Sequence, residues 1–427
     1  MWKASIIFIL VYTALVLTKH YRWLIAWIGI AAALLFGALE VTEIARGINW
    51  NVIGIFVGSL LLAEAFVCSR LPETISDHII NRSPNLGVSL MLIIVFASIF
   101  SIFMDNVVTV LMVAPIALEV TKKADVSPVP VIIGIAISSN LQGMAILIGD
   151  TPSMILAARA HMDFLDFFFY NSSMSSYMTV KIGIFWLVQL GALAGFVVLY
   201  YYFRGEKRKV ESIAVTSVKS WVPVILLALA IVMLSLANFI DPDFVWFSGV
   251  SCVLTGGMSF LYVRIRKLHR EINASLKFDW ETVLFLSAVF VLVYMLEKRG
   301  VVAALVNQLD ILESASPFVV LTAIVWVSVL VSAFIDNVPY ITAALPVVQG
   351  LAKTLGVHPE LLVLGVLIGS CMGGNITPIG AAANLTAIGI LRREGRPVSF
   401  AAFVKIGLPF TLAATLAAYI ALYFVYR

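Results

Sequence analysis

The sequence predicts an all-α polytopic membrane protein: an inverted repeat of five transmembrane helices each, with two re-entrant helical hairpins and two discontinuous helices. Of the 427 residues, 61% are hydrophobic and only 12% are charged, whereas soluble domains are about 25% charged. Apolar runs of about 20 residues, the length of a membrane-spanning helix, recur along the whole chain. Two pairs of segments also repeat each other at an offset of 231 residues, which aligns Asp105 with Asp336 and Gly149 with Gly380.

Ten apolar segments are predicted to span the membrane. They lie near residues 4–18, 23–39, 51–69, 129–159, 175–203, 221–240, 244–263, 280–297, 357–391 and 403–426. With five spans in each half, the second repeat (221–427) crosses the membrane in the opposite sense to the first (1–203), as in many secondary transporters. The charged segment 204–220 is then a cytoplasmic linker between the repeats.

The distribution of Lys and Arg predicts the orientation of the chain. Alternating the spans places most of the 28 basic residues in six loops on one side, whereas the turn that contains Asp241 and Asp243 lies on the other. The basic side is therefore predicted to be cytoplasmic and both termini extracytoplasmic. We expect an integral protein of the plasma (inner) membrane, with the lipid bilayer as a partner.

Two segments of about 35 residues, 88–122 and 316–352, are too short for two spans and too long for one. Each carries an Asp–Asn pair at its centre, where a lipid-facing Asp costs at least about 2.5 kcal/mol. A re-entrant hairpin with its tip inside the protein accommodates this pair, because irregular backbone is tolerated where it lines a wet cavity.

Asp105 and Asp336, at the predicted hairpin tips, are the strongest candidate site residues. Such a carboxylate can hold a sodium ion or take up a proton, and it can also cap the half-helix that follows it. Asn106 and Asn337 beside them offer further ligand oxygens, or they serve as turn residues. All four are candidate sodium ligands, and the expected coupling ion is sodium or a proton.

The segments that follow the hairpins, 129–159 and 357–391, are interrupted centrally by Gly and Pro. Broken helices are the best sequence pointer to a binding site in transporters. Their half-helix N-termini attract anions, but nearby carboxylates repel an anion until cations or protons neutralise them. The other candidate ion- or substrate-binding residues are Asn140, Gly143, Gly149, Asp150, Thr151, Gly374, Asn375, Thr377 and Asn384. The position equivalent to Asp150, which is a candidate ligand or simply a helix cap, is Ala381.

Several function classes lack support in the sequence. The three cysteines are isolated and the five histidines lack metal-ligand spacing, so no cofactor is expected. No basic face interleaved with aromatic residues suggests nucleic acid as a partner, and no GxxxxGK[ST] loop suggests ATP-driven transport. An intramembrane aspartyl protease using Asp105 and Asp150 would leave Asp336 without a role. We therefore expect a transporter and not an enzyme.

The motifs DNV at 105–107 and 336–338, SSN at 138–140 and IGDTPS at 148–153 resemble the ion transporter superfamily. The closest likeness is to its arsenite/citrate permease-like branch, which includes the melanosomal P protein. Dicarboxylate/sodium symporters of the superfamily, which carry Ser-Asn-Thr at both tips, are more distant. The resemblance implies a homodimer in which a scaffold (1–87 and 221–315) holds a transport domain (88–203 and 316–427) that slides like an elevator.

These patterns together predict an ion-coupled secondary active transporter driven by protons or sodium. Its expected substrate is a small ion, an oxyanion or an organic anion. A sodium/proton antiporter is the nearest alternative, because the three carboxylates would suffice without any anion. An anion channel is a further alternative, which saturable counterflow would exclude. Branch members are associated with arsenite efflux, citrate uptake, chloride conductance and sodium/proton exchange.

Overall fold

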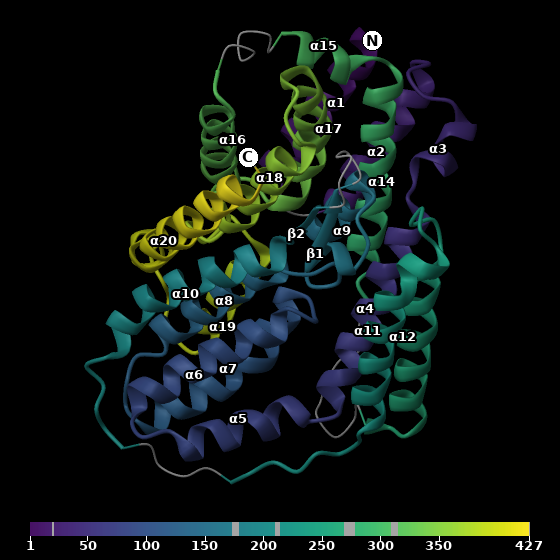
Figure 1. Ribbon diagram of the computed structural model, residues 1–427. Helices are drawn as coiled ribbons and strands as arrows, with labels where there is room; N and C mark the ends of the chain where they lie inside the picture. Colours follow the sequence, from purple (N-terminus) through teal and green to yellow (C-terminus); the bar gives the residue numbers. More distant parts are fainter. Residues whose placement is uncertain (19–20, 173–178, 210–213, 269–277, 309–314, 427) are drawn as a thin grey trace.

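The computed structural model describes residues 1–18, 21–172, 179–209, 214–268, 278–308 and 315–426, and this part of the chain is nearly all helical (Figure 1). The first half contains α1 (Trp2–Leu17), α2 (Arg22–Leu35), α3 (Val41–Gly47), α4 (Trp50–Cys68), α5 (Leu71–Arg82), α6 (Leu86–Ser101), α7 (Asn106–Lys123), α8 (Val129–Gly143), α9 (Thr151–Ala160), the 3₁₀ turn η1 (Leu165–Phe167), β1 (Phe169–Ser172), β2 (Thr179–Ile182) and α10 (Ile184–Phe203). The second half contains α11 (Val222–Ile240), α12 (Phe247–Ile265), α14 (Trp280–Lys298), α15 (Val301–Asn307), α16 (Pro317–Ser332), α17 (Asn337–Leu355), α18 (Pro359–Gly373), α19 (Ala382–Arg393) and α20 (Phe400–Tyr426).

Six of the described helices are long and apolar enough to cross a membrane: α4, α10, α11, α12, α14 and α20. Shorter apolar helices, α1, α2, α6, α8, α16 and α18, accompany them. The outward faces of the long helices carry large apolar side chains, such as Phe239, Leu254 and Phe424. A bilayer supplies the apolar surroundings that such exposed surface requires.

Several helices of each half pack against helices of the other half (Figure 1). Helices α11 and α12 of the second half pack against α4 of the first, and α1 and α2 of the first half pack against α14 of the second. Helices α6, α7 and α8 form one cluster, α16, α17 and α18 form another, and α10 and α20 run side by side between the two clusters. The two halves of the chain therefore share packing interfaces and are not separate domains.

The two 35-residue segments each form a pair of helices joined by a four-residue turn. Helices α6 and α16 begin and end at residues 231 apart, and α7 and α17 begin at Asn106 and Asn337. The same side-chain bond joins each pair to the next helix of the chain. Ser101 Oγ at the end of α6 donates to the carbonyl of Ser139 in α8 at 2.8 Å, and Ser332 Oγ at the end of α16 donates to that of Ser370 in α18 at 2.6 Å. The repeat seen in the sequence is therefore also a repeat of local structure.

Both segments predicted to be discontinuous helices are broken where expected. Residues 144–150 separate α8 from α9, and residues 374–381 separate α18 from α19. Here too the two halves pack against each other, because α9 contacts α17 and α19 contacts α7. The turns at the two breaks therefore lie within the core that the two halves share.

The structure corrects the prediction at 175–203, where a single apolar span was expected. Strands β1 and β2 pair antiparallel, Phe169 with Ile182 and Tyr170 with Lys181, and α10 begins only at Ile184. The sequence 179–182 is rich in β-branched residues, which favour strands. Likewise, the predicted span 23–39 ends as a helix at Leu35, and the short helix α3 follows it.

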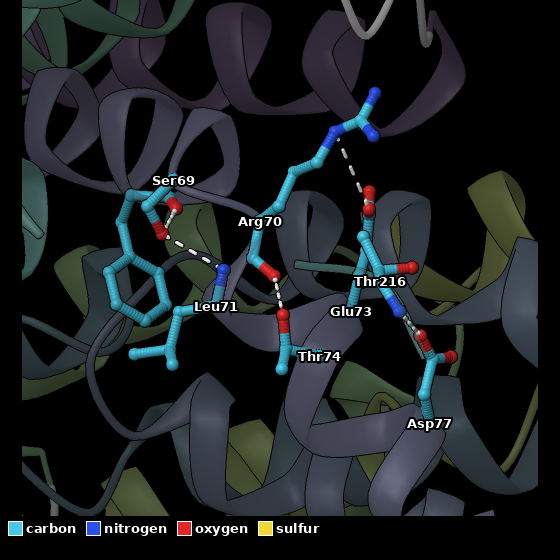
Figure 2. A network of polar contacts seen from close by, with 8 residues as sticks. Ser69, Arg70, Leu71, Glu73, Thr74, Asp77 and Thr216 are labelled. Atoms are coloured by element: carbon cyan, nitrogen blue, oxygen red, sulfur yellow. Dashed lines mark hydrogen bonds and ion pairs between the residues drawn. The ribbon is translucent and has the colours of Figure 1, made fainter. Parts of the chain in front are cut away.

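Of the predicted linker 204–220, the described residues 214–220 lie against α5 and the end of α4. The backbone N–H of Thr216 donates to Asp77 Oδ2 at 2.7 Å, as Figure 2 shows. The backbone N–H of Lys219 donates to the carbonyl of Ser69 at 2.9 Å. The segment between the halves is thus held by hydrogen bonds to the first half.

Candidate functional site

A cavity of about 720 Å³ opens between the two helix-pair turns and the helices α2, α4 and α14. Its walls carry seven of the residues predicted from the sequence: Asp105, Asn106, Asn140, Asp150, Thr151, Asp336 and Asn337. The two aspartates precede α7 and α17, and Asp150 precedes α9, so three half-helix starts converge on one space. The structure therefore brings together carboxylates that are far apart in the sequence.

Asp105 and Asp336 cap the helices that follow them, as one of the two readings predicted. Asp105 Oδ1 accepts from the backbone N–H of Val107 at 2.8 Å, and Asp336 Oδ1 accepts from that of Val338 at 3.2 Å. Capping occupies one oxygen of each carboxylate. The second oxygen of Asp105 takes no hydrogen bond within the described residues, which leaves it able to bind an ion in the cavity.

Asn106 connects the first turn to the broken helix. Its Nδ2 donates to Asn140 Oδ1 at 2.9 Å and lies 3.4 Å from Asp150 Oδ2. Asp150 Oδ1 caps α9 through the backbone N–H of Thr151 at 2.8 Å. Each amide and carboxylate here is at least nine-tenths buried. Buried polar groups that are hydrogen-bonded to one another form a rigid site whose geometry is set before a ligand arrives.

Asn140 continues this network into the second half of the chain. Its Nδ2 donates to Asn375 Oδ1 and to the carbonyl of Cys371, both at 2.9 Å. One fully buried side chain thus links the α7 turn to the break between α18 and α19. The position equivalent to Asn140 in the repeat is Cys371 itself, so the amide group that forms this link has no counterpart in the second half.

The remaining predicted residues shape the turns and do not line the cavity. A Cβ atom on Gly149 would lie 2.4 Å from the carbonyl oxygen of Gly143, and a Cβ on Gly380 would lie 2.5 Å from that of Gly374. Each break therefore needs glycine, because backbone approaches backbone there.

The second break is also held by side chains. Thr377 Oγ1 donates to the carbonyl of Ala333, at the turn before α17. Asn384 Nδ2 donates to the carbonyls of Gly374 and Thr377 at 2.8 and 2.9 Å. Thr377, Asn384 and the three glycines Gly143, Gly149 and Gly374 thus position the site without facing its cavity.

Two cavity residues were missed by the sequence reasoning. Arg22 begins α2 and places its Nη1 2.8 Å from Asp336 Oδ2. No local signal could have found this pair, because its members are 314 positions apart. Glu64 lines the cavity from α4, and its Oε2 is buried without a described partner. A lone carboxylate in the apolar run 51–69 is itself a signal of a functional residue.

The charge of the cavity is strongly one-sided. Its described carboxylates are Glu64, Asp105, Asp150, Asp279, Glu281 and Asp336, whereas Arg22 is the single cationic side chain among the lining residues that the structure describes. Such a lining attracts cations and raises their local concentration. An anion can enter favourably only when bound cations or protons offset this charge.

Proteins that are named as transporters resemble this chain in sequence and in fold. An uncharacterised transporter of Mycobacterium tuberculosis (strain ATCC 25618 / H37Rv) is 28% identical over 366 residues, which cover 84% of this chain and 83% of that protein. The P protein of Mus musculus is 24% identical over 484 residues, which cover 94% of this chain and 57% of that protein. The crystal structure of the YdaH transporter of Alcanivorax borkumensis has a similar fold, with a TM-score of 0.59 at 17% identity over 89% of this chain and 86% of that one.

The helices, the cavity and these relatives define an integral membrane transporter. Residues 12–369 match the citrate transporter family (CitMHS), and the chain belongs to that family. The match confirms the resemblance to the arsenite/citrate permease-like branch that the two pairs of motifs indicated.

Proposed function

We propose that this protein is a cation-coupled secondary active transporter of a small anion, driven by sodium or protons. The observation that carries the proposal is the convergence of Asp105, Asp150 and Asp336 on one cavity from three half-helix starts. Carboxylates buried in a membrane protein are costly, and they mark ion and proton pathways. The family description names citrate, so a carboxylate anion is the first substrate to test.

Coupling follows from the charge of the cavity. Without bound cations, the carboxylates repel an anionic substrate. A cation beside Asp105 and Asp150 lowers this repulsion, and the anion in turn strengthens binding of the cation, since linkage between two sites is reciprocal. Anion and cation would then cross together, and no covalent chemistry is required of the protein.

The proposed mechanism is alternating access of the elevator type. The elements α4 to α9 recur as α14 to α19, with their first residues 230 or 231 positions apart, and helices of each half pack against helices of the other. This supports an inverted repeat in which the pairs α6–α7 and α16–α17 enter the membrane from opposite sides. The scaffold would comprise 1–87 and 221–315, and the transport domain 88–203 and 316–427. We further propose a homodimer in the plasma membrane with both termini extracytoplasmic.

A sodium/proton antiporter is the second candidate, and the excess of carboxylates over Arg22 in the cavity favours it. Such an antiporter needs carboxylates that bind sodium and protons in competition, and it needs no anion. The two candidates differ in whether an anion crosses with the cation. An anion channel differs from both, because it cannot accumulate substrate against a gradient.

Flux into proteoliposomes separates these functions. The purified chain is reconstituted, sodium and pH gradients are imposed separately, and uptake of arsenite, citrate, chloride and sodium is measured. Citrate uptake that overshoots equilibrium under an inward sodium or proton gradient supports symport. Sodium uptake driven by an outward proton gradient, without dependence on any anion, supports the antiporter instead. Uptake that never exceeds equilibrium would contradict both.

A further inference from the structure

The two turns share the sequence Asp-Asn-Val, at 105–107 and 336–338, but they have different electrical surroundings. At the first turn, Asp105 and Asp150 lie in one cavity, and neither carboxylate has an ion pair within the described residues. At the second turn, Ala381 stands where the repeat would place a second carboxylate, and Arg22 pairs with Asp336 at 2.8 Å. The first turn therefore has two carboxylates without an ion pair, whereas the single carboxylate of the second turn is paired with an arginine.

The position of Arg22 accounts for the charge at the second turn. One oxygen of Asp336 caps α17 through Val338, and the other accepts from the guanidinium. The two side chains are mostly buried, at 25% and 13% exposure. A sodium ion on Asp336 would lie within a few ångström of a fixed positive charge. Arginine keeps its charge at any physiological pH, so the two cations exclude each other.

The Nε atom of Arg22 also indicates that the ion pair with Asp336 does more than hold two helices together. Its Nε is buried and has no hydrogen-bond partner within the described residues. An arginine that only held α2 against the turn before α17 would be expected to use its donors fully, because a buried unsatisfied donor is costly. Arg22 instead presents one charge to one carboxylate, as a bound cation would.

We propose that Arg22 is a tethered cation that permanently occupies the second of two potential sodium sites, so that the transported cation binds only at the first turn. This inference rests on the proposed cation coupling and refines its stoichiometry. The repeat supplies two Asp–Asn turns, and the arginine removes one of them from the ion cycle. The difference between Asp150 and Ala381 also favours cation binding at the first turn, because the turn with two carboxylates is the one that no arginine occupies.

The test is a gain of binding. Equilibrium binding of radioactive sodium to the purified full chain is compared between wild type and Arg22→Gln. We expect the variant to bind one more sodium ion per chain. We also expect sodium to raise its melting temperature more than that of wild type, because a ligand that binds the folded state stabilises it. An equal number of sodium ions in the two proteins overturns the proposal.

Two further variants keep the test decisive if Arg22→Gln folds poorly. The double variant Arg22→Gln/Asp336→Asn removes both charges, and it should bind the same number of sodium ions as wild type. Asp336→Asn alone leaves Arg22 without its counter-ion, and it should bind chloride more tightly than wild type does. Chloride affinity equal to that of wild type in this variant also overturns the proposal. Because no transport is measured, failure here leaves the flux experiment on the proposed function unaffected.

Discussion

Replacing Asn140 by Asp tests the hydrogen-bond network that joins the two halves. The side-chain Nδ2 of Asn140 donates at 2.9 Å to Asn375 Oδ1 and at 2.9 Å to the carbonyl of Cys371. Asn140→Asp keeps the shape but places an oxygen against these two acceptors. Each buried group left without a partner costs about 1–3 kcal/mol, so the variant should lose about 2–6 kcal/mol of unfolding free energy. A protonated Asp that donates to one acceptor would halve this loss.

Denaturant titration of the purified protein in detergent, followed by tryptophan fluorescence, measures this loss. Ser139→Ala is the matched control, because the Ser139 hydroxyl is equally buried but donates only within its own helix, to the carbonyl of Ala136 at 2.9 Å. The control should lose less than about 1.5 kcal/mol. An Asn140→Asp variant within about 0.5 kcal/mol of wild type, the range typical of surface substitutions, would refute the network.

Three further predictions address other parts of the molecule. Burial raises the pKa of Asp241, but backbone N–H donors that include Trp246 at 2.7 Å outweigh it and hold the pKa below its ordinary value. Asp241→Asn should therefore lower the free energy of unfolding by about 1–3 kcal/mol at pH 7. In thermal melts, the stability difference between variant and wild type should disappear as the pH falls below about 4. A stability difference that does not depend on pH would argue against this role of the Asp241 carboxylate. Glu297→Gln breaks the ion pair of Glu297 with Arg159 (2.7 Å), which joins α14 to α9. If these two helices move apart during transport, loss of the pair should raise the transport rate up to about fivefold. An unchanged or slower transport rate would count against that motion. Gly149→Ala forces the backbone of the first break apart and should abolish sodium binding, so normal binding by this variant would show that the break is not part of the site.

The sequence predicted the architecture around the site because that architecture is local and repeated. Asp–Asn at the centre of a 35-residue apolar segment required a turn inside the protein, and the turns occur at Asp105 and Asp336. Glycines at equal spacing required breaks, and the breaks follow α8 and α18. Each of these features depends on the cost of placing charge or free backbone groups in a membrane.

The features that the sequence did not predict depend on contacts between distant segments. The pair of Arg22 with Asp336 depends on how α2 packs beside α17, which no local pattern reveals. The strands β1 and β2 lie beside an apolar run, and hydrophobicity alone does not distinguish strand from helix there. Glu64 is a different case, since its isolation among apolar residues was visible in the sequence.

We propose that the cavity carboxylates couple a cation gradient to transport, with Asp105 and Asp150 holding the cation. The most direct measurement is citrate uptake into proteoliposomes under inward sodium or proton gradients, for wild type and for Asp105→Asn/Asp336→Asn. Glu119→Gln is the control, because Glu119 lies on α7 but is exposed and pairs with Lys123 at 2.8 Å. We predict gradient-driven accumulation by wild type and by the control, and none by the double variant. Accumulation by the double variant with unchanged dependence on the gradient would contradict the claim.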